Sequence, residues 1–375
     1  MRDVRLDFFR GLALVFIFLN HVGGNVASWL TNRNFGFSDA TEIFVFVSGY
    51  SAVIAYGAIM QRHGYAVAAA RMIHRIWQLY VAHIFLFVVF SAQIAYVATR
   101  FDNPMYTEEM NLLGLLNDPY VNLIQALVLK FKPANMDVLP LYIVLLIAFL
   151  PILFSMMRWP RATLVSAVML YFVARYAGWN LPSYPQGQNW VFNPFCWQLV
   201  FVLGAWCGLR RDSMVRVAPY NRILLPMSVA YLIFALWIAM SWRFVTLENL
   251  VPGWLEQAMY PISKPNLDPL RLVHFAALAY VTLWLCPPSS PILQQRAAQP
   301  LIQLGRHGLQ VFCLGVFLSF TAHFILVESG GGPLLQLLVS AVGVFLLWVL
   351  AAVLEWYRDA SGQRNKTVKV DRVSS

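Results

Sequence analysis

Two residues suited to acid–base and anion-binding chemistry lie in the first long apolar segment of the chain. Arg10 and His21 are separated by ten residues in RLDFFRGLALVFIFLNH. In a helix with about 100° per residue, their side chains point about 20° apart, on one face. A rise of about 1.5 Å per residue separates them by roughly 16 Å along the axis. This face predicts a fixed cation at one end and a titratable base at the other.

A structural role is the alternative for both residues. Arg10 can extend to lipid headgroups with Asp7 neutralising it, and a single His on an apolar face is commonly a packed core residue. An ionisable side chain that faces the interior of a membrane bundle is nevertheless a functional hypothesis by default. Asn20 and Asn25 flank the imidazole, and we predict them as substrate contacts beside a catalytic His21.

The next apolar segment opens with FSDATEIFVFVSGYSA and carries two acids. Asp39 and Glu42 have the spacing of a capping box at a helix start. The alternative is that Glu42, or in second place Asp39, orients the imidazole, as carboxylates do in catalytic sites. An anionic oxygen that forms during a reaction at such a base would need a hydrogen-bond donor, and Ser48, Asn20 or a backbone amide near Gly49 is a candidate. A Ser-Gly pair also lets helices approach closely.

Beyond these two segments, a set of four residues has side chains suited to binding a carbohydrate. Asp137 lies in NMDVLPLY, and Trp190, Asn193 and Gln198 lie in or just after WNLPSYPQGQNWVFNP, a stretch rich in aromatic residues, Asn and Gln. We predict these residues as contacts to a sugar or another polar ligand. The alternative is an aromatic belt at the membrane interface, joined by turn residues.

The composition defines the kind of protein that must position these residues. Of 375 residues, 59% are hydrophobic and only 12% are charged, against roughly 25% charged residues in soluble domains. The chain is therefore predicted to be an all-α, polytopic integral membrane protein whose partner is the lipid bilayer. The net charge of +10 is spread over the segments between apolar runs, so no nucleic-acid partner is predicted. The four cysteines lack metal-ligand spacing, and no metal is predicted.

Each crossing of the hydrocarbon layer takes about 20 apolar residues, and the apolar runs predict about ten transmembrane helices. The short runs 162–178 and 193–209 and the amphipathic stretch 110–130 leave this count open by one or two. The first run lacks a small-residue cleavage site and is predicted to be a retained helix rather than a signal peptide. The predicted spans are 10–30, 39–60, 76–98, 138–157, 162–178, 193–209, 222–242, 269–286, 300–322 and 333–356.

Lys and Arg are concentrated in alternate segments between these spans. With the N terminus inside, 18 of the 27 lie in or beside the inner segments, which predicts that both termini are cytoplasmic. We predict one transmembrane domain over residues 1–357. A basic, disordered cytoplasmic tail is predicted for residues 358–375.

Three motifs resemble those of the OpgC-type family of the membrane acyltransferase 3 superfamily. They are the Arg10–His21 spacing in a first helix, FVFVSGY (Phe44 to Tyr50) and LGRHGLQVF (Leu304 to Phe312). The resemblance implies about ten helices and a multi-pass protein of the bacterial inner membrane. It also implies transfer of an acyl group, in this branch succinyl, from cytoplasmic acyl-CoA to a periplasmic carbohydrate such as an osmoregulated glucan.

The resemblance further implies roles for individual residues. His21 would be the catalytic base, and Arg10 would help to bind the coenzyme. Because coenzyme A is anionic, its phosphates would favour Arg10 together with basic residues of the inner segments, which we predict to be Arg71 and Arg75 in RMIHR and Arg306 in LGRHG. The chain departs from the wider superfamily at one position, because His323 comes several residues later than the His expected after the late Gly-Arg motif. No role is assigned to it.

Two other functions are compatible with these residues. Buried His, Asn and carboxylate side chains also build proton relays, so a transporter or flippase for a polar solute is one alternative. We detect no inverted repeat that would favour it. Acetyl transfer to another cell-envelope sugar is the second alternative. Turnover of acyl-CoA would distinguish an enzyme from a transporter.

Overall fold

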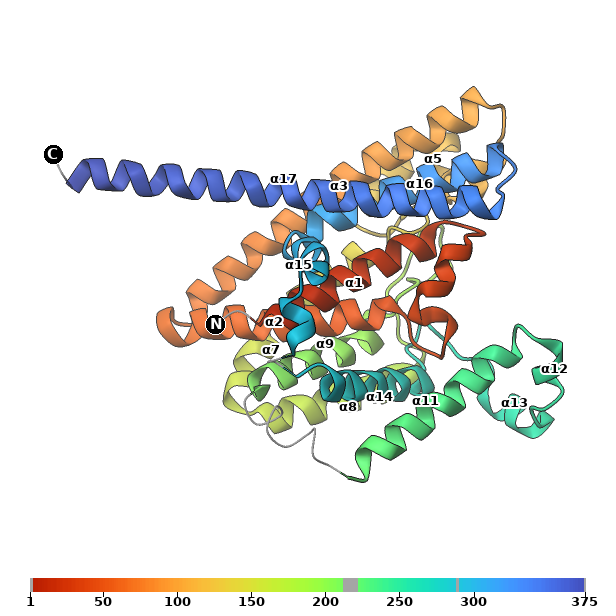
Figure 1. The fold of residues 1–375 in the computed structure, drawn as a ribbon, viewed down its shortest axis with the longest axis horizontal. Helices are drawn as coiled ribbons and strands as arrows, with labels where there is room; N and C mark the ends of the chain where they lie inside the picture. The colour runs from red at the N-terminus through yellow and green to blue at the C-terminus, as the bar shows by residue number, and fades with distance from the viewer. Residues whose placement is uncertain (1–2, 212–221, 288–289, 374–375) are drawn as a thin grey trace. The chain divides into compact units, whose positions relative to one another are not determined.

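The computed structural model describes residues 3–211, 222–287 and 290–373 (Figure 1). Within these ranges every regular element is an α-helix or a short 3-10 helix, apart from one isolated β-bridge between Pro182 and Asn189. This confirms the predicted all-α class. The chain divides into two compact units. Unit 1 comprises Met1–Ser28 and Pro288–Ser375, and unit 2 comprises Trp29–Pro287.

Unit 1 is built around the first helix. The Asp3 carboxylate accepts the backbone N–H of Arg5 at 3.1 Å and caps this helix at its start. The helix ends at His21, because Val22 is extended and Gly24 has a φ of +66°, which glycine adopts without strain. The described helices of unit 1 are α1 (Val4–His21), η4 (Pro291–Gln294), η5 (Arg296–Ala298), α15 (Gln299–Arg306), α16 (Gly308–Glu328) and α17 (Pro333–Val373).

Unit 2 holds seven longer helices and several short ones in its described part. The longer helices are α2 (Ala40–His63), α3 (Tyr65–Arg100), α7 (Val138–Arg158), α8 (Pro160–Ala177), α9 (Pro194–Leu209), α11 (Leu224–Ser241) and α14 (Pro269–Leu285). The short ones are η2 (Asn32–Asn34), α4 (Met105–Glu109), α5 (Leu113–Asn117), α6 (Pro119–Leu127), α12 (Val245–Glu248) and α13 (Gly253–Met259), and η1 (Val26–Leu30) joins the two units in sequence.

The helices α2 and α9 of unit 2 meet backbone to backbone. A methyl group at Gly49 would overlap the carbonyl oxygen of Phe201, and one at Gly204 would overlap that of Phe46. This confirms close helix packing as a role of the Ser-Gly pair. Gly49 lies in the middle of α2, so its amide belongs to the helical hydrogen-bond ladder and is a poor oxyanion donor.

Helices occur at all ten predicted positions, and six of them are long and apolar enough to cross a membrane. Those six are α2, α3, α7, α11, α16 and the Pro333–Ser361 part of α17. The apolar helices α9 and α14 are shorter, with 16 and 17 residues. Helix α1 carries three charged residues, Arg5, Asp7 and Arg10, in its first half. The membrane character of the chain is thus supported, whereas ten spans and cytoplasmic termini stay predictions.

Two predicted boundaries are corrected, and the open question about residues 110–130 is answered. The first helix was expected over 10–30 but covers Val4–His21, because Gly23 and Gly24 follow it. The single span expected over 300–322 is two helices, which break at His307 between α15 and α16. The amphipathic stretch 110–130 forms the short helices α5 and α6 rather than a span.

One helix extends beyond its predicted span. Helix α17 continues to Val373, through most of the segment that the sequence predicts to be a disordered tail.

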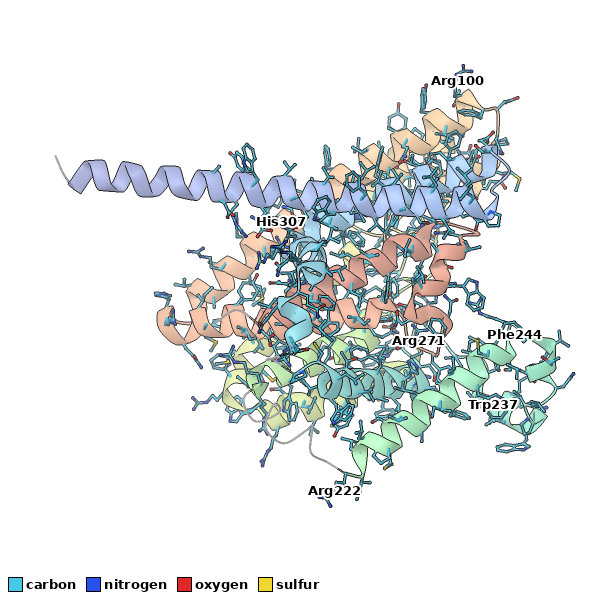
Figure 2. The ribbon with its side chains drawn as sticks, in the orientation of Figure 1. Arg100, Arg222, Trp237, Phe244, Arg271 and His307 are labelled. Atoms are coloured by element: carbon cyan, nitrogen blue, oxygen red, sulfur yellow. The ribbon has the colours of Figure 1, made fainter. Side chains whose placement is uncertain are left out.

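In Figure 2, Trp237 lies on α11 and Phe244 lies just beyond its C-terminal end. There α11 packs with Phe37 and Met259 in a small apolar cluster, which holds α13 against α11.

Candidate functional site

Glycines bring the Arg10 segment of α1 into contact with α15 in unit 1. A methyl group at Gly305 would overlap the carbonyl oxygen of Asp7, and one at Gly11 would overlap that of Leu301. The two backbones therefore approach as closely as helices can. As a result the Arg10 guanidinium donates to the carbonyl oxygen of Gly305 at 3.2 Å and pairs with the Asp7 carboxylate at 3.4 Å.

Arg306, the residue after Gly305, joins the same carboxylate. Its Nε lies 3.9 Å from Oδ2 of Asp7, and its Nη1 pairs with Glu355 of α17. A Cβ at Gly308 would lie 3.1 Å from Cδ of Arg10, so the LGRHG motif encloses the Arg10 side chain. The structure thus brings together two of the four cations that were predicted to bind coenzyme phosphates.

The other two predicted cations lie on α3 in unit 2. Arg71 is exposed, and Arg75 is partly exposed and donates to Oε1 of Gln78 at 3.2 Å. Their role toward a coenzyme stays a prediction.

The α1–α15 contact gives a testable prediction. Gly305→Ala is expected to destabilise the protein by about 1–3 kcal/mol, because the added methyl group must push two backbones apart. The matched control is Gly315→Ala, where a Cβ would meet Leu347 at an ordinary 3.9 Å and alanine favours the helix by about 0.5–1 kcal/mol. Thermal unfolding in detergent measures both. Equal melting temperatures for the two variants would contradict the close contact.

His21 is the last residue of α1 and is partly exposed, as is Asn20 beside it. The turn that follows is fixed to α17. The Asn25 amide donates to Oγ of Ser340 at 2.9 Å, and the backbone N–H of Val26 donates to Oε1 of Gln336 at 2.8 Å. Asn25 therefore lies beyond the helix and holds this turn in place, and substrate contact by Asn25 or Asn20 stays a prediction.

The structure also places His323 in this region of unit 1. A Cβ at Gly23 would lie 2.8 Å from Nδ1 of His323, so this imidazole of α16 packs on the chain two residues after His21. No pattern in the sequence indicates this contact, because it joins segments about 300 residues apart.

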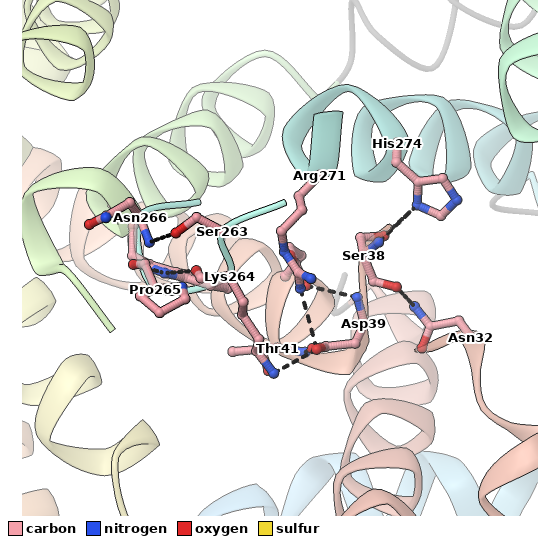
Figure 3. A network of polar contacts seen from close by, with 12 residues as sticks. Asn32, Ser38, Asp39, Thr41, Ser263, Lys264, Pro265, Asn266, Arg271 and His274 are labelled. Atoms are coloured by element: carbon pink, nitrogen blue, oxygen red, sulfur yellow. Dashed lines mark hydrogen bonds and ion pairs between the residues drawn. The ribbon is translucent and has the colours of Figure 1, made fainter. Parts of the chain in front are cut away.

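Unit 2 contains a second polar cluster, at the start of α2 (Figure 3). The predicted capping box is present: Asp39 accepts the N–H of Thr41 at 2.8 Å, and Glu42 accepts the N–H of Asp39 at 2.9 Å. Arg271 of α14 also binds both acids, at 2.6 Å from Glu42 and 3.3 Å from Asp39. Lys264 lies 2.6 Å from Asp39.

These pairings set the charge state of the cluster. Burial alone would raise the pKa of the Asp39 carboxyl, but the adjacent Lys264 and Arg271 hold this pKa well below its usual value. Asp39 is therefore a permanent anion. Both predicted acids are engaged by unit 2 cations, and their role in orienting the imidazole of His21 stays a prediction.

The loop that carries Lys264 is itself held in place. The indole N–H of Trp197 donates to the carbonyl oxygens of Lys264 and Pro265 at 3.3 and 3.2 Å, and the Asn193 amide donates to Oδ1 of Asn266 at 3.0 Å. Asn193 also caps α9. The Gln198 amide donates to the carbonyl oxygen of Ala167 at 2.7 Å. Asn193 and Gln198 thus have structural partners, and their contact with sugar stays a prediction.

Sequence reasoning missed two residues of this cluster. The cation Arg271 inside the apolar helix PLRLVHF was the available signal, because a membrane segment retains a charge only with a partner. One turn later, Nδ1 of His274 accepts hydrogen bonds from the N–H and Oγ of Ser38, at 3.2 and 2.7 Å. Since a backbone N–H can only donate, the imidazole proton sits on the other nitrogen.

Asp137 and Trp190, two predicted sugar contacts, share Lys132 as a neighbour. The ammonium of Lys132 lies 4.0 Å from the centroid of the Trp190 ring. Burial lowers the pKa of Lys132 to about 8, which Asp137 partly offsets. Burial likewise raises the pKa of Asp137 to about 6, against the attraction of Lys132. Both groups therefore change charge closer to neutral pH than is usual for their types.

Asp137 gives a pH prediction. Its pKa in the folded state, about 6, exceeds the ordinary 3.8, so the folded state binds this proton more tightly than the unfolded state. Its contribution to stability is therefore lost as the pH rises from about 4 through about 6. We expect Asp137→Asn to flatten the fall in melting temperature between about pH 4 and about pH 6. The exposed Asp102→Asn should leave that slope unchanged, and an unchanged slope for Asp137→Asn would contradict the assignment.

Comparison with known proteins adds one finding to this geometry. The profile of the family described as OpgC protein matches residues 2–359 of the chain. No curated protein and no solved structure matches.

Proposed function

Because the chain belongs to the OpgC family, a family of membrane acyltransferases, we propose that it moves a succinyl group from cytoplasmic acyl-CoA to a carbohydrate outside the bacterial inner membrane. An osmoregulated periplasmic glucan is the proposed acceptor. The family match supports acyl transfer and membrane location. The acyl group, the coenzyme and the acceptor are our proposals.

The observation that carries the proposal is the arrangement of Arg10 and His21 on one helix. Both lie in α1, which is helical from Val4 to His21, so the spacing of eleven residues corresponds to roughly 16 Å along the axis. Arg10 is held at one end by Asp7 and Gly305, and His21 occupies the other end. A coenzyme whose phosphates bind at Arg10 would need its slender pantetheine arm to reach along α1 toward the imidazole.

The proposed chemistry is a direct transfer. The neutral imidazole of His21 takes the proton of an acceptor hydroxyl as the oxygen attacks the thioester carbonyl carbon. The new C–O bond forms, and the C–S bond then breaks to release the coenzyme thiolate. This thiolate needs no strong acid to leave, since a thiol has a pKa of about 8.5. The proton held by the imidazolium returns to solvent or to the thiolate, and the enzyme is restored.

The residues around Lys132 and Lys264 in unit 2 are the proposed acceptor site. They combine charged groups with two aromatic rings, because Lys132 lies over Trp190 and Lys264 lies 5.4 Å from the Phe192 centroid. Carbohydrate sites use such mixtures, in which an apolar ring face meets the sugar C–H groups and polar groups bind the hydroxyls.

Mass spectrometry of periplasmic glycans tests the proposal. Cells that lack the gene should lose one acyl substituent from a glycan, and the mass difference identifies both the acyl group and the acceptor. Re-expression of the wild-type chain should restore the substituent. Identical glycan profiles in the two strains, in a medium that induces the glucans, would refute the proposed acceptor.

A further inference from the structure

Glu355 of α17 connects two arginines in unit 1. Its Oε1 pairs with Nη1 of Arg306 and lies 3.0 Å from Nη2 of Arg358. Asp7 plays the same part toward Arg10 and Arg306. The five side chains thus form a ladder in which three guanidinium groups alternate with two carboxylates.

Burial differs between the two kinds of group in this ladder. The side chains of Asp7 and Glu355 are only 4% and 13% exposed, whereas those of Arg306 and Arg358 are 27% and 49% exposed. The acids Asp7 and Glu355 therefore lie behind the bases. On the exposed side, Arg358 also pairs with Asp359 at 3.3 Å, and this carboxylate is 64% exposed. A carboxylate that binds one edge of a guanidinium fixes the plane of the group and the direction of its remaining N–H donors.

Three oriented guanidinium groups in a row fit a ligand that carries several phosphate groups. Phosphate oxygens pair bidentately with arginine. The three guanidinium groups outnumber the two carboxylates behind them, and the further carboxylate on Arg358, that of Asp359, is exposed, so a phosphate group can compete for its place. We propose that Arg358 is a third binding residue, beside Arg10 and Arg306, for the polyphosphate end of a nucleotide, and that Glu355 is a positioning residue for Arg306 and Arg358. This inference rests on the proposed function in taking the nucleotide to be that of acyl-CoA.

Binding measurements on the full chain in nanodiscs of zwitterionic lipid test the inference. The probes are coenzyme A and adenosine 3′,5′-bisphosphate, which carries phosphates but no pantetheine arm. Arg358→Gln is expected to weaken binding of both probes about tenfold, a change of 1.4 kcal/mol. The control is Arg296→Gln, which removes an equal charge from an exposed position of the same unit and should change binding less than twofold.

Replacing Glu355 separates a positioning role from a simple charge effect, because the two predict opposite changes in the affinity for the bisphosphate. Removing a negative charge beside an anion site tightens anion binding if charge alone matters. If Glu355 positions the arginines, Glu355→Gln weakens binding of the bisphosphate, and Glu355→Asp restores part of it. Tighter binding by Glu355→Gln, or equal effects of Arg358→Gln and Arg296→Gln, would overturn the inference.

The phosphate groups of lipid headgroups would pair with arginine in the same way as those of a nucleotide. A second experiment separates these two kinds of ligand. Nanodiscs with anionic phosphatidylglycerol are compared with the zwitterionic ones. If Arg358→Gln alters only the effect of anionic lipid and not the affinity for the bisphosphate, the ladder binds headgroups and the inference fails. Wild-type protein that binds coenzyme A but transfers no acyl group would instead refute the proposed function and leave the phosphate site standing.

Discussion

Replacing His21 by alanine is expected to lower the turnover of acyl transfer by about 10²–10⁴-fold, the range that a positioned general base contributes. The expected loss is in kcat, because the proposed role of the imidazole is to take the proton of the attacking hydroxyl. Binding of coenzyme A should change little, since the proposed phosphate contacts are on Arg10 and Arg306, at the other end of α1. The measurement is release of free coenzyme from succinyl-CoA in the presence of the glycan acceptor.

His63→Ala is the matched control, because this imidazole is exposed at the end of α2. It should retain wild-type turnover. Both variants are compared by size-exclusion chromatography and by thermal unfolding, so that a folding defect is recognised. A His21→Ala enzyme with normal kcat and a wild-type melting temperature would remove the imidazole from the mechanism. The proposed acyltransferase activity would then need another base.

The sequence predicted the class of fold and most helix positions because these depend on local composition. Long apolar runs identify helices without knowledge of their neighbours, and the Asp39–Glu42 spacing predicted a capping box that the structure confirms. The end of the first helix was missed, because Gly23 and Gly24 stop α1 at His21 although apolar residues continue to Leu30. Two consecutive glycines were the local signal.

The partners of the candidate residues could not be predicted, because they come from distant parts of the chain. Arg306 meets Asp7 from a segment about 300 residues further along the chain, and Glu355 of a third segment meets Arg306. Arg271 reaches Glu42 across more than 200 residues. A single sequence shows that a buried charge needs a partner, but only the packed helices decide which residue supplies it.

Replacing Arg271 by methionine is expected to destabilise the protein by about 3–5 kcal/mol, the usual cost of leaving a buried charge without its partner. The Glu42 side chain is fully buried and that of Arg271 is 10% exposed, so water cannot replace the lost guanidinium. Arg271 binds two carboxylates, whereas Lys264 reaches only Asp39. Glu42 would therefore be left beside Asp39 with no cation in contact.

The double variant Arg271→Met/Glu42→Gln separates loss of charge balance from loss of packing. Glutamine can still accept the backbone N–H of Asp39 and keep the capping box, while it removes the uncompensated charge. We expect the double variant to recover most of the stability. Chemical denaturation in detergent of the wild type, Arg271→Met, Glu42→Gln and the double variant would measure this non-additivity. Arg100→Met, on the exposed end of α3 (Figure 2), should stay within about 0.5 kcal/mol of wild type. If the double variant is as unstable as Arg271→Met, the guanidinium stabilises α14 through packing, and the ion pair with Glu42 is not what holds α2 and α14 together.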